Sequence, residues 1–95
     1  MKKFSVIDQN KPMQFFVDCI GCVLVPQKHD KVMIITASGN HVDVGIQLPH
    51  AISQLLYDKI LEAAKTGGTV IIPDIEEMND DEIRIALSDI TITQD

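Results

Sequence analysis

The segment 13–25, MQFFVDCIGCVLV, constrains the fold of this chain more than any other part of the sequence. In an extended strand, successive side chains point to opposite faces of the sheet. Both alternating sets of this segment are apolar, and Asp18 is its only charged residue. Such a strand needs cover on both sides, so the segment predicts a long strand that is buried on both faces for much of its length.

Two further strands are predicted at residues 31–37 and 41–47. The residues between them, Ser-Gly-Asn, favour a turn because Gly and Asn tolerate positive φ angles. The second of these strands alternates apolar and polar residues, which is typical of a strand with one buried face. Since short connections join neighbouring antiparallel strands, the three segments predict a meander.

The hydrophobic period changes to that of a helix over residues 49–65. Pro49 suits the first turn of a helix, where its missing N–H group costs no hydrogen bond. Gly67 and Gly68 favour the end of the helix, because glycine readily adopts the left-handed conformation found there. The segment therefore predicts one amphipathic helix.

The part that follows the helix predicts two more strands. Residues 69–72 form a short apolar run that Pro73 ends. The apolar residues of 83–92 fit a helix, and they also fit a strand with one change of phase. The strand is the preferred interpretation, because the Ile and Thr residues of this segment favour extended backbone. The phase change near Ser88 then corresponds to a bulge or a tight bend.

Together these elements predict a single α+β domain over residues 1–95, in the order β-β-β-α-β-β. They form either a five-stranded, mostly antiparallel sheet or an OB-like small barrel, with one helix. The order resembles that of the OB-fold, whose helix follows the third strand, and the resemblance covers residues 13–92. Residues 1–12 precede this core and are predicted to form an extra edge strand or an arm.

The charge of the chain disfavours two classes of partner. Asp and Glu total 14 against 8 Lys and Arg, and the net charge is −6. A chain of this charge repels phosphate backbones and anionic lipids. The apolar run behind Lys2 and Lys3 is shorter than the about 7–15 residues of a secretory signal, and no segment approaches the about 18 residues of a membrane span. We therefore expect a cytoplasmic protein that contacts no membrane.

A cluster of acidic residues lies within PDIEEMNDDE, before the last predicted strand. It lacks the Asp-x-Asp-x-Asp-Gly order of a calcium loop, so a solvated connector is the preferred interpretation. Exposed acidic groups speed association with a basic surface and select its orientation. We therefore interpret the chain as a non-enzymatic interaction module without a cofactor, which binds a protein partner. The residues predicted to contact this partner are Glu76, Glu77, Asp80, Asp81 and Glu82.

Binding of single-stranded nucleic acid is the first alternative function. OB-like barrels often stack bases on exposed aromatic rings within a basic groove. The candidate residues for such a surface are Phe15, Phe16, Lys28, Lys31 and Arg84. The net charge of the chain makes this alternative less favoured than a protein partner.

A metal or redox site at Cys19 and Cys22 is the second alternative, because these residues have the Cys-x-x-Cys spacing. In a regular strand, residues three positions apart point to opposite faces, so the two thiols do not converge. A redox motif needs a helix N-terminus to lower the thiol pKa, and none is predicted here. Gly21 instead favours a bend in a long strand, with both cysteines as small buried hydrophobic residues and no metal.

Overall fold

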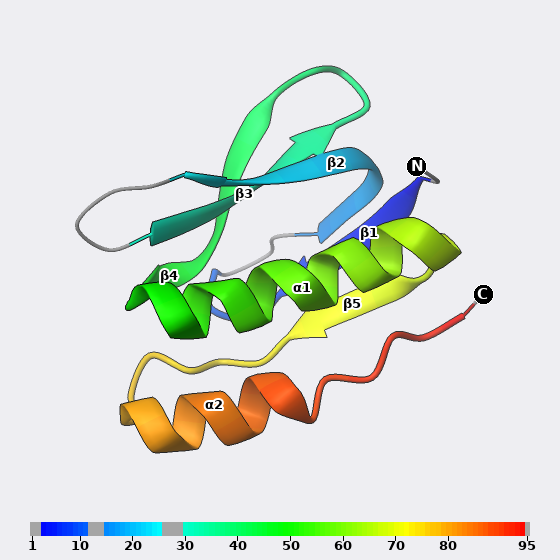
Figure 1. Cartoon of the computed structure of the whole chain (residues 1–95). Helices are drawn as coiled ribbons and strands as arrows, with labels where there is room; N and C mark the ends of the chain where they lie inside the picture. Colours follow the sequence, from blue (N-terminus) through cyan, green and yellow to red (C-terminus); the bar gives the residue numbers. More distant parts are fainter. Residues whose placement is uncertain (1–2, 12–14, 26–29, 95) are drawn as a thin grey trace.

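The computed structural model describes residues 3–11, 15–25 and 30–94 (Figure 1). Its strands and helices, in chain order, are β1 (Phe4–Asp8), β2 (Phe15–Val25), β3 (Asp30–Thr36), β4 (His41–Leu48), α1 (His50–Thr66), β5 (Thr69–Ile72) and α2 (Asp80–Ser88). The five strands form one sheet in the order β4-β3-β2-β1-β5. The α+β class and the five-stranded, mostly antiparallel sheet are therefore confirmed.

The pairing of the strands departs from the predicted order at the N-terminus. The meander β2-β3-β4 is antiparallel, as expected, and β1 is also antiparallel to β2. However, β1 lies between β2 and β5 and runs parallel to β5. The strand predicted within residues 1–12 is thus present, but it is internal to the sheet and not an edge strand. The strands β4 and β5 are the two edges of the sheet, which gives no support to the OB-like barrel.

The strand predicted over residues 83–92 was the wrong choice, because α2 occupies Asp80–Ser88. The observed order is therefore β-β-β-β-α-β-α, with two helices. The side chain and backbone of Asn79 exchange hydrogen bonds with those of Glu82, which forms a capping box at the start of α2. Ile83 and Leu87, one turn apart, are buried on the same side of the helix. Capping and packing together outweigh the weak preference of Ile for strands.

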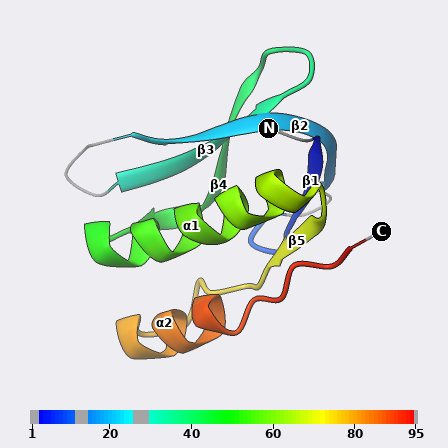
Figure 2. The same ribbon diagram turned by 45° about the vertical axis from the view of Figure 1, so that its right-hand side comes forward.

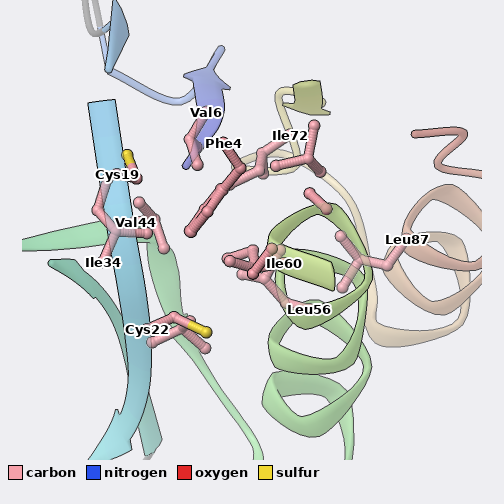
Figure 3. Packing of buried hydrophobic residues seen from close by; sticks show 14 of the residues in the cluster. Phe4, Val6, Cys19, Cys22, Ile34, Val44, Leu56, Ile60, Ile72 and Leu87 are labelled. Atoms are coloured by element: carbon pink, nitrogen blue, oxygen red, sulfur yellow. The ribbon is translucent and has the colours of Figure 1, made fainter. Parts of the chain in front are cut away.

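The helix α1 provides the cover for one face of the sheet (Figures 1 and 2). It contacts all five strands, and α2 packs on α1. Figure 3 shows Phe4 of β1 between β2 and α1, and Leu87 reaching from α2 towards α1. The helix ends where expected: Gly67 adopts a left-handed conformation (φ 78°), and its N–H group donates to the carbonyl of Ala63.

Over residues 18–25, where the side chains of β2 are described, the strand is buried on one face only, so the prediction that both faces are buried was wrong for this part. Cys19 and Cys22 face the core, whereas Ile20 and Val23 are 44% and 37% exposed. The sheet has one helical layer, α1, and α2 lies on α1 and not on the opposite face of the sheet (Figure 1). The sequence indicated correctly that both sets of side chains are apolar, but the described part of the chain supplies cover for only one of them.

Asn10 links the end of β1 to the segment that follows β5. Its Nδ2 donates to Oδ1 of Asp8 at 3.0 Å and to the carbonyl of Pro73 at 2.9 Å. Its Oδ1 accepts from the N–H of Ile75, also at 2.9 Å. Asp8 and Ile75 are both buried, so these hydrogen bonds satisfy polar groups that water does not reach.

The chain that follows α2 returns along β5 and protects the edge of the sheet. Thr69 and Thr93 form an antiparallel bridge with hydrogen bonds of 2.8 and 2.9 Å. Gly68 permits this approach, because a Cβ atom there would lie only 2.6 Å from the carbonyl oxygen of Thr93. The bridge covers part of an edge whose backbone groups would otherwise invite pairing with another chain.

Candidate functional site

The acidic residues singled out in the sequence lie in the β5–α2 connection and in the first turn of α2. All five are exposed: Glu76, Glu77, Asp80, Asp81 and Glu82. Three of them also stabilise the helix. Asp80, Asp81 and Glu82 lie near the positive end of the helix dipole. Oδ1 of Asn79 accepts from the N–H of Glu82 at 2.9 Å, and Oε1 of Glu82 accepts from the N–H of Asn79 at 3.2 Å.

Glu76 and Glu77 have no such role in the helix and are the clearer candidates for binding. They lie in a turn where Oδ1 of Asp74 accepts from the N–H of Glu76 at 3.2 Å. With Asp74 and Met78, they line an open pocket of about 260 Å³. Its lining combines three acidic residues with the apolar side chain of Met78.

Ile85 belongs to the same surface, and the sequence reasoning missed it. It is 63% exposed, more than any other large hydrophobic residue of the described chain. On a helix it lies next to residues three and four positions away, which here are Asp81, Glu82, Ser88 and Asp89. The strand interpretation placed Ile85 on the same face as Ile83, whereas helical spacing separates them.

We call this region the acidic α2 surface. Its members are exposed residues of α2, of its C-cap or of the connection before it, and they are Glu76, Glu77, Asp80, Asp81, Glu82, Ile85 and Asp89. Arg84 lies beside it, with Nη1 at 3.8 Å from Oδ1 of Asp81. A second cation, Lys59 of α1, lies near the C-terminal end of the surface, where its Nζ donates to the carbonyl of Ile90 at 3.0 Å. The carboxylates outnumber these two cations, so the surface is negative, and Ile85 is its one large apolar side chain.

The residues proposed for nucleic-acid binding are not gathered at one place. Lys28 and the side chains of Phe15 and Phe16 lie outside the described residues. Lys31 is on β3, and its Nζ lies 3.9 Å from Oδ2 of Asp43. Arg84 is on α2, which α1 separates from β3 in both views (Figures 1 and 2). The two described basic residues therefore do not form one patch, and each lies next to a carboxylate.

Cys19 and Cys22 share the buried side of β2, contrary to the expectation that they point apart. Cys19 pairs with Thr36 of β3 and Gly21 with Ile35, so Ile20 is an extra residue that makes a β-bulge. The bulge shifts the alternation by one residue, which turns both thiols into the core, and Figure 1 shows β2 bending along its length. Figure 3 shows the two cysteines along β2 within the hydrophobic cluster.

Burial raises the pKa of both thiols from the usual 9.0 to about 11, and the negative charge of Asp18 adds to the effect on Cys19. Metal binding and thiol redox chemistry both require the thiolate, which such a pKa disfavours at neutral pH. Among the described residues, no three His, Cys, Asp or Glu side chains lie close enough together to hold one metal ion.

We expect both thiols to react slowly with Ellman's reagent in the native protein and rapidly after denaturation in urea. The reagent needs an accessible thiolate, and both groups are buried and protonated at pH 7.

The raised pKa values also predict that the stability contributed by the two neutral thiols is fully present below about pH 9. This contribution is lost as the pH rises through about 11, because only the unfolded state ionises readily. One zinc ion per chain, or fast native reaction, would contradict the buried-hydrophobe interpretation.

Comparison with known proteins gives no family for this chain. No protein-family model, no curated protein and no solved structure matches it. Within the described residues, α1 and α2 are both unsuited to crossing a membrane, because neither is long and apolar enough.

Proposed function

We propose that the chain is a non-enzymatic, cytoplasmic interaction protein that binds a protein partner through the acidic α2 surface. The partner would carry a basic surface with an apolar recess. The observation that carries the proposal is the exposed Ile85 surrounded by carboxylates. Large apolar side chains at the centre of a polar rim are typical of protein interfaces, where the central residue supplies most of the binding energy.

The carboxylates favour a partner of opposite charge. Coulomb attraction between complementary surfaces raises the association rate and orients the two proteins before contact. Arg84 and Lys59 are cations beside the surface, but its carboxylates outnumber them, so the attraction favours a basic partner. A basic protein that normally contacts nucleic acid would fit this description, because its binding site has the required charge.

The contribution of the apolar centre is tested by replacing Ile85 with alanine. We expect at least about a tenfold loss of affinity for the partner, which is the effect of truncating a central interface residue. The partner is first isolated as a protein from the source cell that binds the wild-type chain, and its affinity is then measured by surface plasmon resonance. Ile71→Ala is the matched control, because Ile71 is 41% exposed but lies on β5. Equal effects of the two substitutions would refute a role for Ile85.

The contribution of charge is tested with the double substitution Glu76→Gln and Glu77→Gln, which leaves the capping box of α2 intact. We expect slower association with the partner and a weaker dependence on salt, with little change in dissociation. Asp58→Asn with Glu62→Gln is the control, since both residues are exposed on α1 and the net charge changes equally. An unchanged partner association rate, combined with tighter binding of a single-stranded oligonucleotide, would favour the nucleic-acid alternative instead.

A further inference from the structure

The face of the sheet opposite α1 carries a continuous apolar patch on β2 and β3. Its members are Ile20, Val23, Val25, Met33 and Ile35. In the register of the two strands, Val23 lies opposite Met33 and Gly21 opposite Ile35, so the apolar residues are neighbours across the strands. Ile20 and Val23 are exposed, and the other three are half-buried. We call this set the outer β2–β3 patch.

Solvent rarely faces such a patch in a monomeric protein. An antiparallel sheet with one wet face normally presents polar residues there, and contiguous exposed apolar patches mark interaction sites. The bulge at Ile20 adds to the patch, because it turns Ile20 outward while keeping both cysteines in the core. The described helices do not reach this face, since α1 lies on the opposite face of the sheet and α2 lies on α1 (Figure 1).

Charged groups at the border of the patch are of both signs. Lys31 of β3 and Asp43 of β4 are partly exposed there, with 3.9 Å between Nζ and Oδ2. Met33 pairs with Asp43 across β3 and β4, and Lys31 pairs with Val25 across β2 and β3. Nζ of Lys11 also donates to the backbone carbonyl of Asp43, and Asp18 of β2 is exposed. The border therefore holds charges of both signs beside the same apolar centre.

We propose that the outer β2–β3 patch binds a second copy of this chain in a two-fold symmetric dimer. In such a dimer the same surface of both copies meets itself, so a patch that carries both signs of charge is self-complementary. A two-fold axis that passes between Lys31 and Asp43 sets Lys31 of each copy against Asp43 of the other. The apolar residues of the two copies then form a shared core with a polar border, as in other protein interfaces.

The distribution of charge favours a second copy over a basic partner at this face. The chain carries a net charge of −6, but seven of its acidic residues belong to the segment from Asp74 to Asp89. This segment includes α2, which lies on the side of α1 that faces away from the sheet (Figure 1). The molecule measures 32 × 26 × 24 Å, so contact through the outer patch keeps the two acidic α2 surfaces many Debye lengths of about 8 Å apart. Repulsion between two copies is therefore largely screened at physiological salt.

The dimer is tested by sedimentation velocity and by size-exclusion chromatography with light scattering, over a concentration series of the whole chain. We expect the mass to rise with concentration from 10.5 kDa to twice that value. A mass that stays at 10.5 kDa throughout the series would overturn the proposal. It would leave the face for a different partner, and the function proposed for the acidic α2 surface would not be affected.

Two substitutions to lysine locate the interface. Ile20→Lys is expected to weaken the dimer at least about tenfold, because it buries a charge at the centre of the contact. Ile85→Lys is the matched control, since Ile85 is also an exposed isoleucine but lies on α2, which is not on this face of the sheet. Circular dichroism and thermal melting confirm that both variants fold. Equal weakening by the two substitutions would contradict an interface at β2 and β3.

A charge exchange provides a second test that does not alter the apolar residues. Lys31→Glu is expected to weaken the dimer, because it sets two negative charges against each other across the interface. Adding Asp43→Lys restores one cation and one anion in exchanged positions, and dimerisation is expected to recover. Recovery supports the paired border, whereas a double variant as weak as the single variant would argue against this arrangement.

Discussion

Phe4→Ala is expected to lower the free energy of unfolding by about 3–5 kcal/mol, the usual effect of removing a buried aromatic side chain. Phe4 is 1% exposed, and Figure 3 shows it between β2 and α1. It belongs to β1, which pairs with β2 on one side and β5 on the other. Since a domain of this size has only about 5–15 kcal/mol of total stability, the variant would be close to unfolding.

Urea denaturation followed by circular dichroism measures this effect, with Ile85→Ala as the control. Ile85 is a large apolar residue on the surface, so its truncation is expected to change stability by about half a kcal/mol or less. A Phe4→Ala midpoint that matches the control would mean that this segment is an arm, one of the two alternatives predicted for residues 1–12, and not part of the sheet.

Asn10→Ala is expected to destabilise the fold by about 2–4 kcal/mol, although Asn10 is in a turn. Its side chain makes three hydrogen bonds, to Asp8, Pro73 and Ile75. Each such bond contributes about 0.5–1.5 kcal/mol, and a buried group left without its partner costs more. Alanine would remove the hydrogen bonds that hold the start of the β5–α2 connection to the end of β1.

Asn40→Ala is the control for this second experiment. Asn40 also lies in a turn, and its Nδ2 donates to the hydroxyl of Ser38, but the contact is exposed and water can replace it. Thermal unfolding of both variants is expected to show a large decrease in Tm for Asn10→Ala and a small one for Asn40→Ala. Similar decreases would show that the hydrogen bonds of Asn10 contribute no more than those of an exposed turn.

The elements with one clear hydrophobic period were predicted well from the sequence. The helix over 49–65 matches α1, and the strands over 31–37 and 41–47 match β3 and β4 within one residue. In each case the pattern, the flanking turn residues and the packing agree. The α+β class followed from these elements, because a helix between short strands has only a sheet on which to pack.

The errors lie where sequence pattern and tertiary contact disagree. Residues 83–92 satisfied two periods, and only packing on α1, with the capping box at Asn79, selects the helix. The short apolar run at β1 gave no sign that it forms an internal strand of the sheet. Its parallel neighbour β5 follows in the chain only after the meander and α1. Parallel pairing of this kind leaves no turn signal in the sequence.

The candidate site was predicted in part. The exposure of the acidic residues was expected and is observed, and only the position of α2 separates those that cap a helix from Glu76 and Glu77. Ile85 was missed because its exposed position beside the carboxylates depends on helical geometry. The facing of Cys19 and Cys22 was also missed, since a single bulged residue reverses the alternation on which the argument rested.

The parallel pairing of β1 with β5 also constrains the order in which the chain can fold. The hairpins β2–β3 and β3–β4 close short loops, so they can form early during synthesis. β1 leaves the ribosome first, yet its second neighbour arrives only after α1 and β5 have been made. Until then the backbone edge of β1 that later pairs with β5 stays open to mispairing or to chaperones. The β1–β5 end of the sheet is thus completed late, and slow steps in refolding are expected at this contact, not in the meander.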